Sequence, residues 1–148
     1  MFKIHSLIAG QLGLGHTNQT DRVLCIKSLK FHRTNEKVLL AACGQQSSLV
    51  ATNFGSLHAF GSNHRCQLGV KPSVLTKMYP SPIKIQCSSM RFSWKQISMG
   101  AEHACVLANN GQVYVWGSNL YGQCGFEQKY PMIETPTQLK LVYAGDSM

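Results

Sequence analysis

A Gln-x-Gly motif recurs along this chain at a constant interval of 56 residues, at Gln11, Gln67 and Gln123. The same step separates two glycine pairs that lie upstream of the later motifs, Gly44 with Gly100 and Gly61 with Gly117. A fixed period of this size indicates that one supersecondary unit is copied along the chain. We therefore expect a repeat protein whose function lies on the surface of an array, not an enzyme with a single catalytic pocket.

The repeat preserves its turns more strictly than its strands. Residues 44–69 and 100–125 share nine identities in 26 positions, and seven of the nine are Gly, Asn or Ser. Those residue types provide positive φ angles or local side-chain hydrogen bonds in turns. The glycines that we expect to be structural are Gly13, Gly44, Gly55, Gly61, Gly69, Gly100, Gly111, Gly117 and Gly125.

Short apolar runs between these turns predict strands. The expected strands are 38–43, 49–52 and 57–60 in one copy, and 96–99, 104–107 and 113–116 in the next. An Asn-x-Gly turn joins the second and third strands of each copy, which favours a hairpin. Phe60 and Trp116 stand just before a glycine in each copy, and we expect each ring to pack against a neighbouring sheet.

The Gln-x-Gly element is predicted to be the last element of each unit, where one blade closes and the next connection begins. The pattern is lost over the roughly twenty residues that follow it. Pro80 and Pro136 nevertheless keep the 56-residue step there. A proline excludes a central strand at its position, so we expect loops in this region.

The composition fits a turn-rich, all-β chain, with 13 glycines and only 14% charged residues. The formal net charge is +8, and most of the basic residues fall between the repeat cores. Solvation of exposed loops is the favoured interpretation, and an acidic protein partner or a phosphate backbone is the alternative. The candidate partner-binding residues are Lys27, Lys30, Arg33, Lys37, Lys71, Lys77 and Lys84.

The remaining polar residues do not suggest catalysis or a cofactor. The six histidines are scattered, the six acidic residues form no recognisable pair, and the glycine-rich stretch 10–15 lacks the Lys-Ser/Thr ending of a phosphate loop. The six cysteines include no Cys-x-x-Cys pair, and no signal peptide or membrane-length apolar run is evident. We therefore expect an intracellular protein with reduced thiols and no metal, in which Cys43 and Cys105 are small core residues.

The combination of Gly-x-x-x-x-x-x-Val, Asn-x-Gly, Phe/Trp-Gly-Ser-Asn and Gln-x-Gly at this interval resembles the regulator of chromosome condensation repeat. The stretch 37–44 is most similar to the retinitis pigmentosa GTPase regulator branch of that family. The resemblance covers residues 10–140 and implies a seven-bladed β-propeller whose blades are four-stranded antiparallel sheets.

The chain holds about two and a half such units, so a partial propeller is expected: a fragment, a truncated isoform or a degenerate relative. We interpret residues 1–9 as a degenerate N-terminal strand and 141–148 as a truncated tail. The repeats occupy 10–140, with cores near 10–15, 38–70 and 94–126.

The resemblance implies a non-enzymatic module for protein–protein interaction, in small-GTPase regulation or in ciliary and trafficking scaffolding. One alternative is a guanine-nucleotide exchange factor for a small GTPase, which expels nucleotide without covalent chemistry. A second alternative is chromatin or nucleic-acid binding through the basic loops. The implied compartment is the cytoplasm or cilium, with the nucleus as the alternative.

Overall fold

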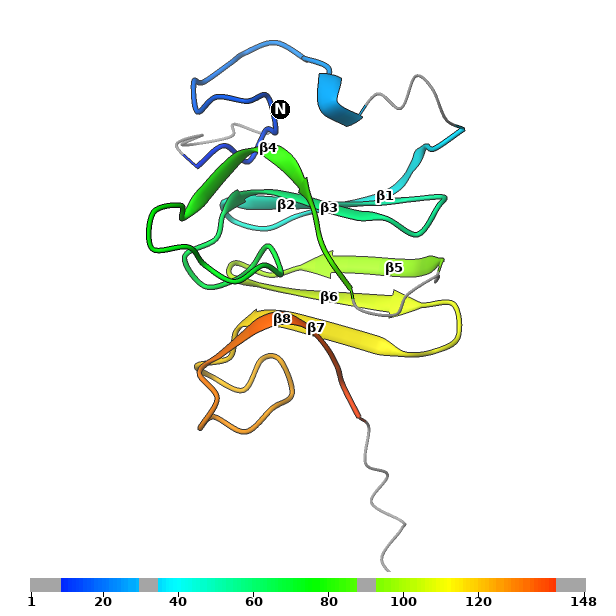
Figure 1. Cartoon of the computed structure of the whole chain (residues 1–148), viewed down its shortest axis with the longest axis vertical. Helices are drawn as coiled ribbons and strands as arrows, with labels where there is room; N and C mark the ends of the chain where they lie inside the picture. The colour runs from blue at the N-terminus through cyan, green and yellow to red at the C-terminus, as the bar shows by residue number, and fades with distance from the viewer. Residues whose placement is uncertain (1–8, 30–34, 88–92, 141–148) are drawn as a thin grey trace, which may run out of the picture.

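The computed structural model describes residues 9–29, 35–87 and 93–140, which form an all-β array of two stacked four-stranded antiparallel sheets (Figure 1). The first sheet contains β1 (Val38–Cys43), β2 (Ser47–Thr52), β3 (Leu57–Ser62) and β4 (Met78–Lys84). The second contains β5 (Trp94–Met99), β6 (His103–Ala108), β7 (Val113–Ser118) and β8 (Met132–Gln138). A short 3-10 helix, η1 (Lys27–Leu29), precedes the first sheet. The predicted fold class, a partial propeller of four-stranded blades, is confirmed.

Each sheet is a meander in which consecutive strands are neighbours, and its central hairpin turns at the predicted Asn-x-Gly. The N–H of Gly55 donates to the carbonyl of Thr52 over 3.0 Å, and the N–H of Gly111 donates to the carbonyl of Ala108 over 3.0 Å. Gly55 has a φ of 77°, a left-handed conformation that a side chain disfavours. The two hairpins predicted from the sequence are therefore present.

Alternate residues of the strands form the core between the two sheets. Leu49 and Ala51 on β2 and Leu57 and Ala59 on β3 are at most 2% exposed. They belong to one buried cluster with alternate residues of the second sheet, Ala104, Val106, Tyr114 and Trp116. A strand sends successive side chains to opposite faces, so this period-two pattern assigns one face of each sheet to the shared core.

The other face of the first sheet is covered by the N-terminal segment, residues 9–29, which lies above it in Figure 1. The hydroxyl of Ser48 donates to the carbonyl of Gln11 over 2.8 Å. A Cβ atom at Gly13 would lie only 3.0 Å from the ring of Phe60, so this ring packs directly on the glycine. The first Gln-x-Gly motif thus contacts the first sheet as the Gln-x-Gly loop at 67–69 contacts the second sheet.

The fourth strands correct the expectation that the Gln-x-Gly element ends each unit. The motif lies in the long loop between β3 and β4, and again between β7 and β8, so each blade gains one more strand after it. Met78 and Met132 occupy equivalent pairings with Ser62 and Ser118, which makes the repeat step 54 residues in the fourth strand. The loop is therefore two residues shorter in the second blade.

The same shift corrects the proline alignment. Pro136 is structurally equivalent to Pro82, not to Pro80, and all three prolines lie in strands instead of loops. These strands tolerate proline because β4 and β8 are the outermost strands of their sheets, where one side of the backbone needs no partner.

One cysteine expectation was also wrong. Cys43 is exposed at the end of β1, whereas Cys105 is partly buried on β6. The predicted N-terminal strand 1–9 and tail 141–148 lie outside the described residues, apart from Ala9.

Candidate partner-binding surface

The two long loops after β3 and β7 lie at the same end of the stacked sheets, on the left of Figure 1. We call this surface the loop rim and define it as residues 63–77 and 119–131. The asparagine at the start of each loop and the glutamine of each Gln-x-Gly motif fasten it from within. Their hydrogen bonds determine whether the two loops have a fixed conformation.

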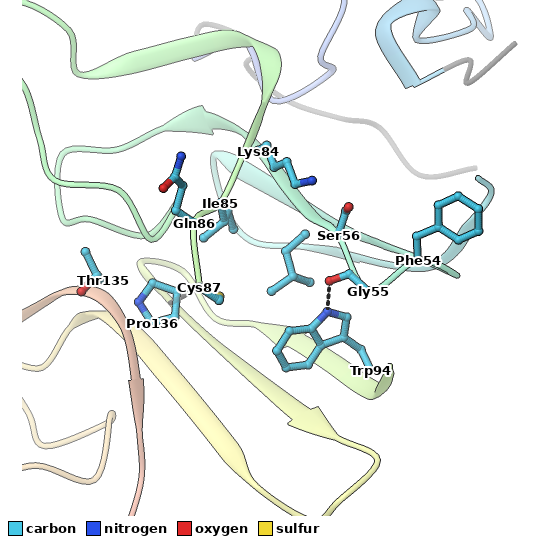
Figure 2. Close-up of a pocket in the computed structure, with 11 residues that line it drawn as sticks. Phe54, Gly55, Ser56, Lys84, Ile85, Gln86, Cys87, Trp94, Thr135 and Pro136 are labelled. Atoms are coloured by element: carbon cyan, nitrogen blue, oxygen red, sulfur yellow. Dashed lines mark hydrogen bonds between the residues drawn. The ribbon is translucent and has the colours of Figure 1, made fainter. Parts of the chain in front are cut away.

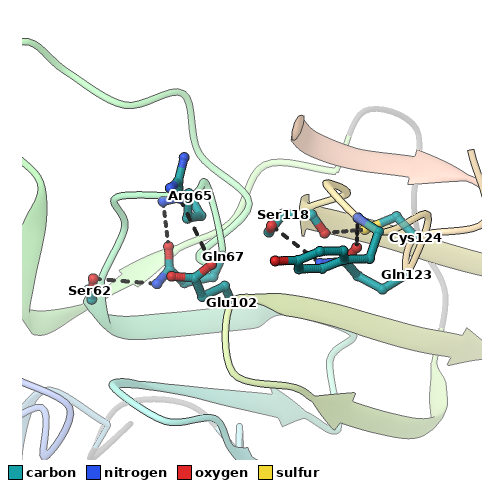
Figure 3. A network of polar contacts seen from close by, with 8 residues as sticks. Ser62, Arg65, Gln67, Glu102, Ser118, Gln123 and Cys124 are labelled. Carbon is teal, nitrogen blue, oxygen red and sulfur yellow. Dashed lines mark hydrogen bonds and ion pairs between the residues drawn. The ribbon is translucent and has the colours of Figure 1, made fainter. Parts of the chain in front are cut away.

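The first loop is held by Asn63 and Gln67, both buried. The Asn63 side-chain oxygen accepts the N–H of Leu68 over 3.1 Å, and its amide donates to the carbonyl of Val70 over 3.0 Å. The Gln67 side-chain oxygen accepts the N–H of Arg65 over 2.8 Å, and its amide donates to the hydroxyl of Ser62 over 3.4 Å (Figure 3).

The second loop repeats these contacts residue for residue. The side-chain oxygen of Asn119 accepts the N–H of Cys124 over 3.0 Å, and that of Gln123 accepts the N–H of Tyr121 over 2.9 Å. The Gln123 amide donates to the Ser118 hydroxyl over 3.3 Å (Figure 3). The repeated Asn and Gln are therefore loop clamps that hold the rim in one conformation.

Several large apolar side chains of the loop rim are exposed to solvent. Val74 and Leu75 are 94% and 93% exposed, and Tyr121 is 84% exposed. Leu120 and Tyr130 are exposed as well. Exposed aromatic and aliphatic groups on loops that a rigid scaffold positions are a common feature of protein–protein interfaces.

The rim also carries more positive than negative charge. Lys71 and Lys77 lie in the first loop and Lys129 in the second, where Glu127 is the acidic residue. Lys71 approaches Glu134 at 3.5 Å and Lys129 approaches Glu127 at 2.7 Å, but these are exposed pairs. Exposed ion pairs add little stability, so these contacts do not hold the loops together and the rim keeps a positive surface.

The structure does not bring the predicted basic residues together on one surface. Lys71 and Lys77 lie on the loop rim, Lys37 and Lys84 lie at the opposite end of the first sheet, and Lys27 lies on η1. Lys30 and Arg33 fall outside the described residues. Partner binding by this set therefore stays a prediction, with the rim pair as its best-placed members.

The predicted structural glycines lie in turns, in the Gln-x-Gly loops and in strands β3 and β7. Positive φ angles occur at Gly13, Gly55, Gly61, Gly69, Gly111, Gly117 and Gly125. Gly44 and Gly100 instead start tight turns, in which their N–H groups donate to the carbonyls of Ser47 and His103.

A cleft of about 680 Å³ opens between the blades at the hairpin-turn end (Figure 2). Phe54, Lys84, Cys87, Trp94 and Pro136 contribute to its lining. The indole N–H of Trp94 donates to the carbonyl of Gly55 over 2.9 Å, which ties the start of β5 to the first hairpin turn. Sequence reasoning missed this cleft, although an apolar residue in a turn, such as Phe54, was a usable signal.

Burial raises the pKa of most of the thiols in the array. It raises the pKa of Cys66 and Cys124, each to about 11, and that of Cys87 also to about 11. Cys25 and Cys43 are exposed. Because the thiolate is the reactive form, a thiol whose pKa is raised in the fold reacts slowly near neutral pH.

We therefore expect iodoacetamide at pH 7.5 to modify Cys25 and Cys43 in the folded protein, and to modify Cys66 and Cys124 only after denaturation. Peptide mass spectrometry of samples labelled with and without urea measures this directly. Equal labelling of Cys66 and Cys25 under native conditions would contradict the buried position of the Cys66 loop.

Within the described residues, no group of three or more His, Cys, Asp or Glu side chains is placed to hold a metal ion. No helix in that part of the chain is long and apolar enough to cross a membrane.

Comparison with known proteins assigns this architecture to a family of propeller repeats. The family model described as "Regulator of chromosome condensation (RCC1) repeat" matches residues 55–107 and 110–144, more than half of the chain. The chain therefore belongs to the regulator of chromosome condensation repeat family, as the resemblance of its motifs predicted.

Individual relatives cover most of this chain but little of their own length. The mouse X-linked retinitis pigmentosa GTPase regulator is 37% identical over 120 residues, which is 81% of this chain and 11% of the relative. Mouse protein RCC2 is 34% identical over 116 residues, which is 78% of this chain and 21% of the relative. The chain is thus a partial repeat protein relative to both.

A solved structure of yeast RCC1 (Prp20) bound to Kap60 has a TM-score of 0.72 to this chain at 23% identity. The match covers 92% of this chain and 32% of the yeast chain. At this identity the likeness concerns the fold, and it supports the interpretation of the two sheets as propeller blades.

Proposed function

We propose that this chain is a non-enzymatic propeller module that binds a protein partner through the loop rim. The observation that carries the proposal is the combination on one surface of clamped loops and exposed large side chains. Rigid loops lower the entropic cost of binding, because little conformational freedom is lost when the partner docks. The positive charge of the rim favours a partner with an acidic surface.

A small GTPase is the partner class that we assign first, with ciliary or trafficking scaffolding as the setting. The support comes from the relatives: one is named as a GTPase regulator, and it shares 37% identity with this chain. Guanine-nucleotide exchange is the narrower alternative, in which the rim would wedge against the GTPase and release nucleotide. We place the protein inside the cell, in the cytoplasm or cilium, or in the nucleus if the partner is chromatin.

Chromatin or nucleic-acid binding is the weaker alternative. A yeast relative of the same fold is described by its binding to histones, at 24% identity. In this chain, however, the described basic candidates divide between the loop rim, the opposite end of the first sheet and η1, so they do not form one track for a phosphate backbone. Binding of this kind would weaken steeply as salt is raised, because it depends on counterion release.

A panel of immobilised nucleotide-free small GTPases, read by biolayer interferometry, tests the proposal. We expect at least one to bind, and we expect Leu75→Ser combined with Tyr121→Ser to weaken that binding by about tenfold or more, since exposed apolar and aromatic anchors dominate interfaces. Surface substitutions of this kind leave stability within about 0.5 kcal/mol. Val23→Ser is the matched control, because Val23 is fully exposed on the N-terminal segment, away from the rim.

Release of labelled GDP from any GTPase that binds separates the two activities. Faster release in the presence of the protein supports exchange, and binding without release supports a scaffold. A panel in which no GTPase binds would overturn the GTPase assignment. Binding that Leu75→Ser and Tyr121→Ser leave unchanged would overturn the assignment of the loop rim.

A further inference from the structure

The outward face of the second sheet is built like a face that already binds a blade. We call it the terminal face and define it as Cys105 and Leu107 on β6, Val113 and Val115 on β7, and Leu139 after β8. Within the part of the chain that the structure describes, no strand covers it (Figure 1). Cys105, Leu107, Val113 and Leu139 are only partly buried.

The equivalent residues of the first sheet are fully covered. Leu49, Ala51 and Leu57, which precede Cys105, Leu107 and Val113 by one repeat step, are at most 2% exposed because the second sheet lies on them. The two faces therefore have the same pattern of residues, and they differ in that a described sheet covers only the first of them.

The two sheets show how one blade packs on such a face: a tryptophan of the second sheet contacts the Gln-x-Gly loop of the first. The indole N–H of Trp116 donates to the carbonyl of Gln67 over 2.9 Å. A Cβ atom at Gly69 would lie 3.1 Å from the same indole nitrogen, so the glycine makes room for the ring. Gln123 and Gly125 repeat this receiving element on the terminal face.

The chain also carries the complementary surface. Phe60 stands on β3 where Trp116 stands on β7, and its ring packs on Gly13. The Ser48 hydroxyl donates to the Gln11 carbonyl, as the Trp116 indole donates to Gln67. The Phe60 face is therefore occupied by a Gln-x-Gly element of the same kind as the one at 123–125.

The segment that occupies the Phe60 face packs on it at Gly10 and Gly13 but contributes no strand to the first sheet. Its helix η1 has no buried residue, and Val23 and Leu24 are exposed. None of its described residues pairs with β1–β4 as a strand, and Gly15 makes a single backbone hydrogen bond to Pro80. A competing Gln-x-Gly element backed by a whole sheet would bury more apolar area than this segment does.

The geometry points to head-to-tail self-association, in which the terminal face of one copy binds the Phe60 face of a second copy and displaces its residues 9–29. The Phe60 ring takes the place beside Gly125 that the Leu139 side chain of the first copy now occupies, and the Gln123 carbonyl accepts the Ser48 hydroxyl. Such an interface is heterologous, so it extends into longer assemblies unless the rotation closes a ring. The +8 net charge opposes association, so raising the salt concentration strengthens it.

Sedimentation velocity over a range of protein and salt concentrations tests the inference on the full chain. Gly10→Ala should increase association about tenfold or more, since a Cβ there would lie 2.5 Å from the Pro80 Cα and push the N-terminal segment away. Gly125→Val should weaken association by a similar factor, because the new side chain adds to Leu139 in the space that the Phe60 ring needs. Gly111→Val is the matched control, with a similar positive φ and nothing within 4 Å of its Cβ.

The double variant Gly10→Ala with Gly125→Val separates the specific contact from aggregation of a loosened chain. It should return to monomer, and an association that persists in it would overturn the inference. Wild type and Gly10→Ala that both remain monomeric at high salt would also overturn it.

Photo-crosslinking from a photoreactive leucine analogue at position 139 identifies the surface that is contacted. Head-to-tail contact yields peptides from 41–60 of the other copy. Crosslinks to 103–115 would mean that two terminal faces pair with each other, and would also overturn the inference.

Discussion

Replacing Trp116 with alanine should lower the free energy of unfolding by about 3–5 kcal/mol, the range for truncating a fully buried tryptophan. Trp116 is 0% exposed and lies between the two sheets. Its loss leaves a cavity there, and it also leaves the buried carbonyl of Gln67 without its 2.9 Å donor. Urea unfolding followed by circular dichroism measures the change without depending on tryptophan fluorescence.

Trp116→Phe is the informative control because Phe60 fills the equivalent position in the first blade. It keeps an aromatic ring against Gly69 and removes the indole donor, so we expect a loss of about 1–3 kcal/mol. A loss below about 1 kcal/mol for the alanine variant would mean that the two blades do not share a packed core. Equal losses for the two variants would assign the whole effect to the hydrogen bond.

The sequence predicted the strands that lie in the core because two independent signals coincide there. Alternating apolar residues mark β2, β3, β6 and β7, and glycine-containing turns bound them. Phe60 and Trp116 were recognisable as packing residues because each stands beside a glycine at the same place in the repeat. Gly13 and Gly69 could be recognised as repeat positions, but the sequence does not show that the two rings pack against them.

The fourth strands could not be predicted in the same way. β4 and β8 are outermost, carry prolines and contain no fully buried residue, so their sequences lack the apolar alternation of a half-buried strand. The loop before β8 is also two residues shorter than the loop before β4, which hides the repeat from a search at one fixed step. Loops absorb such length changes at little cost in free energy, whereas strands in register do not.

The candidate surface was only partly predictable for a different reason. The solvent exposure of Leu75 and Tyr121 depends on the conformation of their loops. Asn63 and Asn119 fix that conformation through hydrogen bonds to residues five or more positions away. The positive charges could be located in the sequence, but their division between two ends of the sheet depends on which turns lie at which end. Tertiary placement, not residue type, decides both features.

Replacing Gly117 with alanine should destabilise the second blade by about 3 kcal/mol or more, from backbone strain together with a steric clash. Gly117 has a φ of 105°, which disfavours any side chain. An added Cβ would lie 2.4 Å from the carbonyl oxygen of Glu102 and 2.6 Å from the Cα of His103. Both are backbone atoms of the neighbouring strand segment, so relief requires β6 and β7 to separate.

Hydrogen exchange locates this damage as well as measuring it. The Ser118 N–H donates to the Glu102 carbonyl over 2.8 Å, and we expect its exchange to accelerate in Gly117→Ala along with that of its neighbours on β7. Gly111→Ala is the matched control, because its φ of 87° gives the same kind of strain with no atom within 4 Å of the new Cβ. That control should cost about 1 kcal/mol. If the two variants lose the same free energy of unfolding, the approach of the Glu102 carbonyl is not what requires glycine at position 117. By the same reasoning, alanine at Gly61 should destabilise the first blade as alanine at Gly117 destabilises the second, because its Cβ would lie 2.3 Å from the Gln46 carbonyl oxygen.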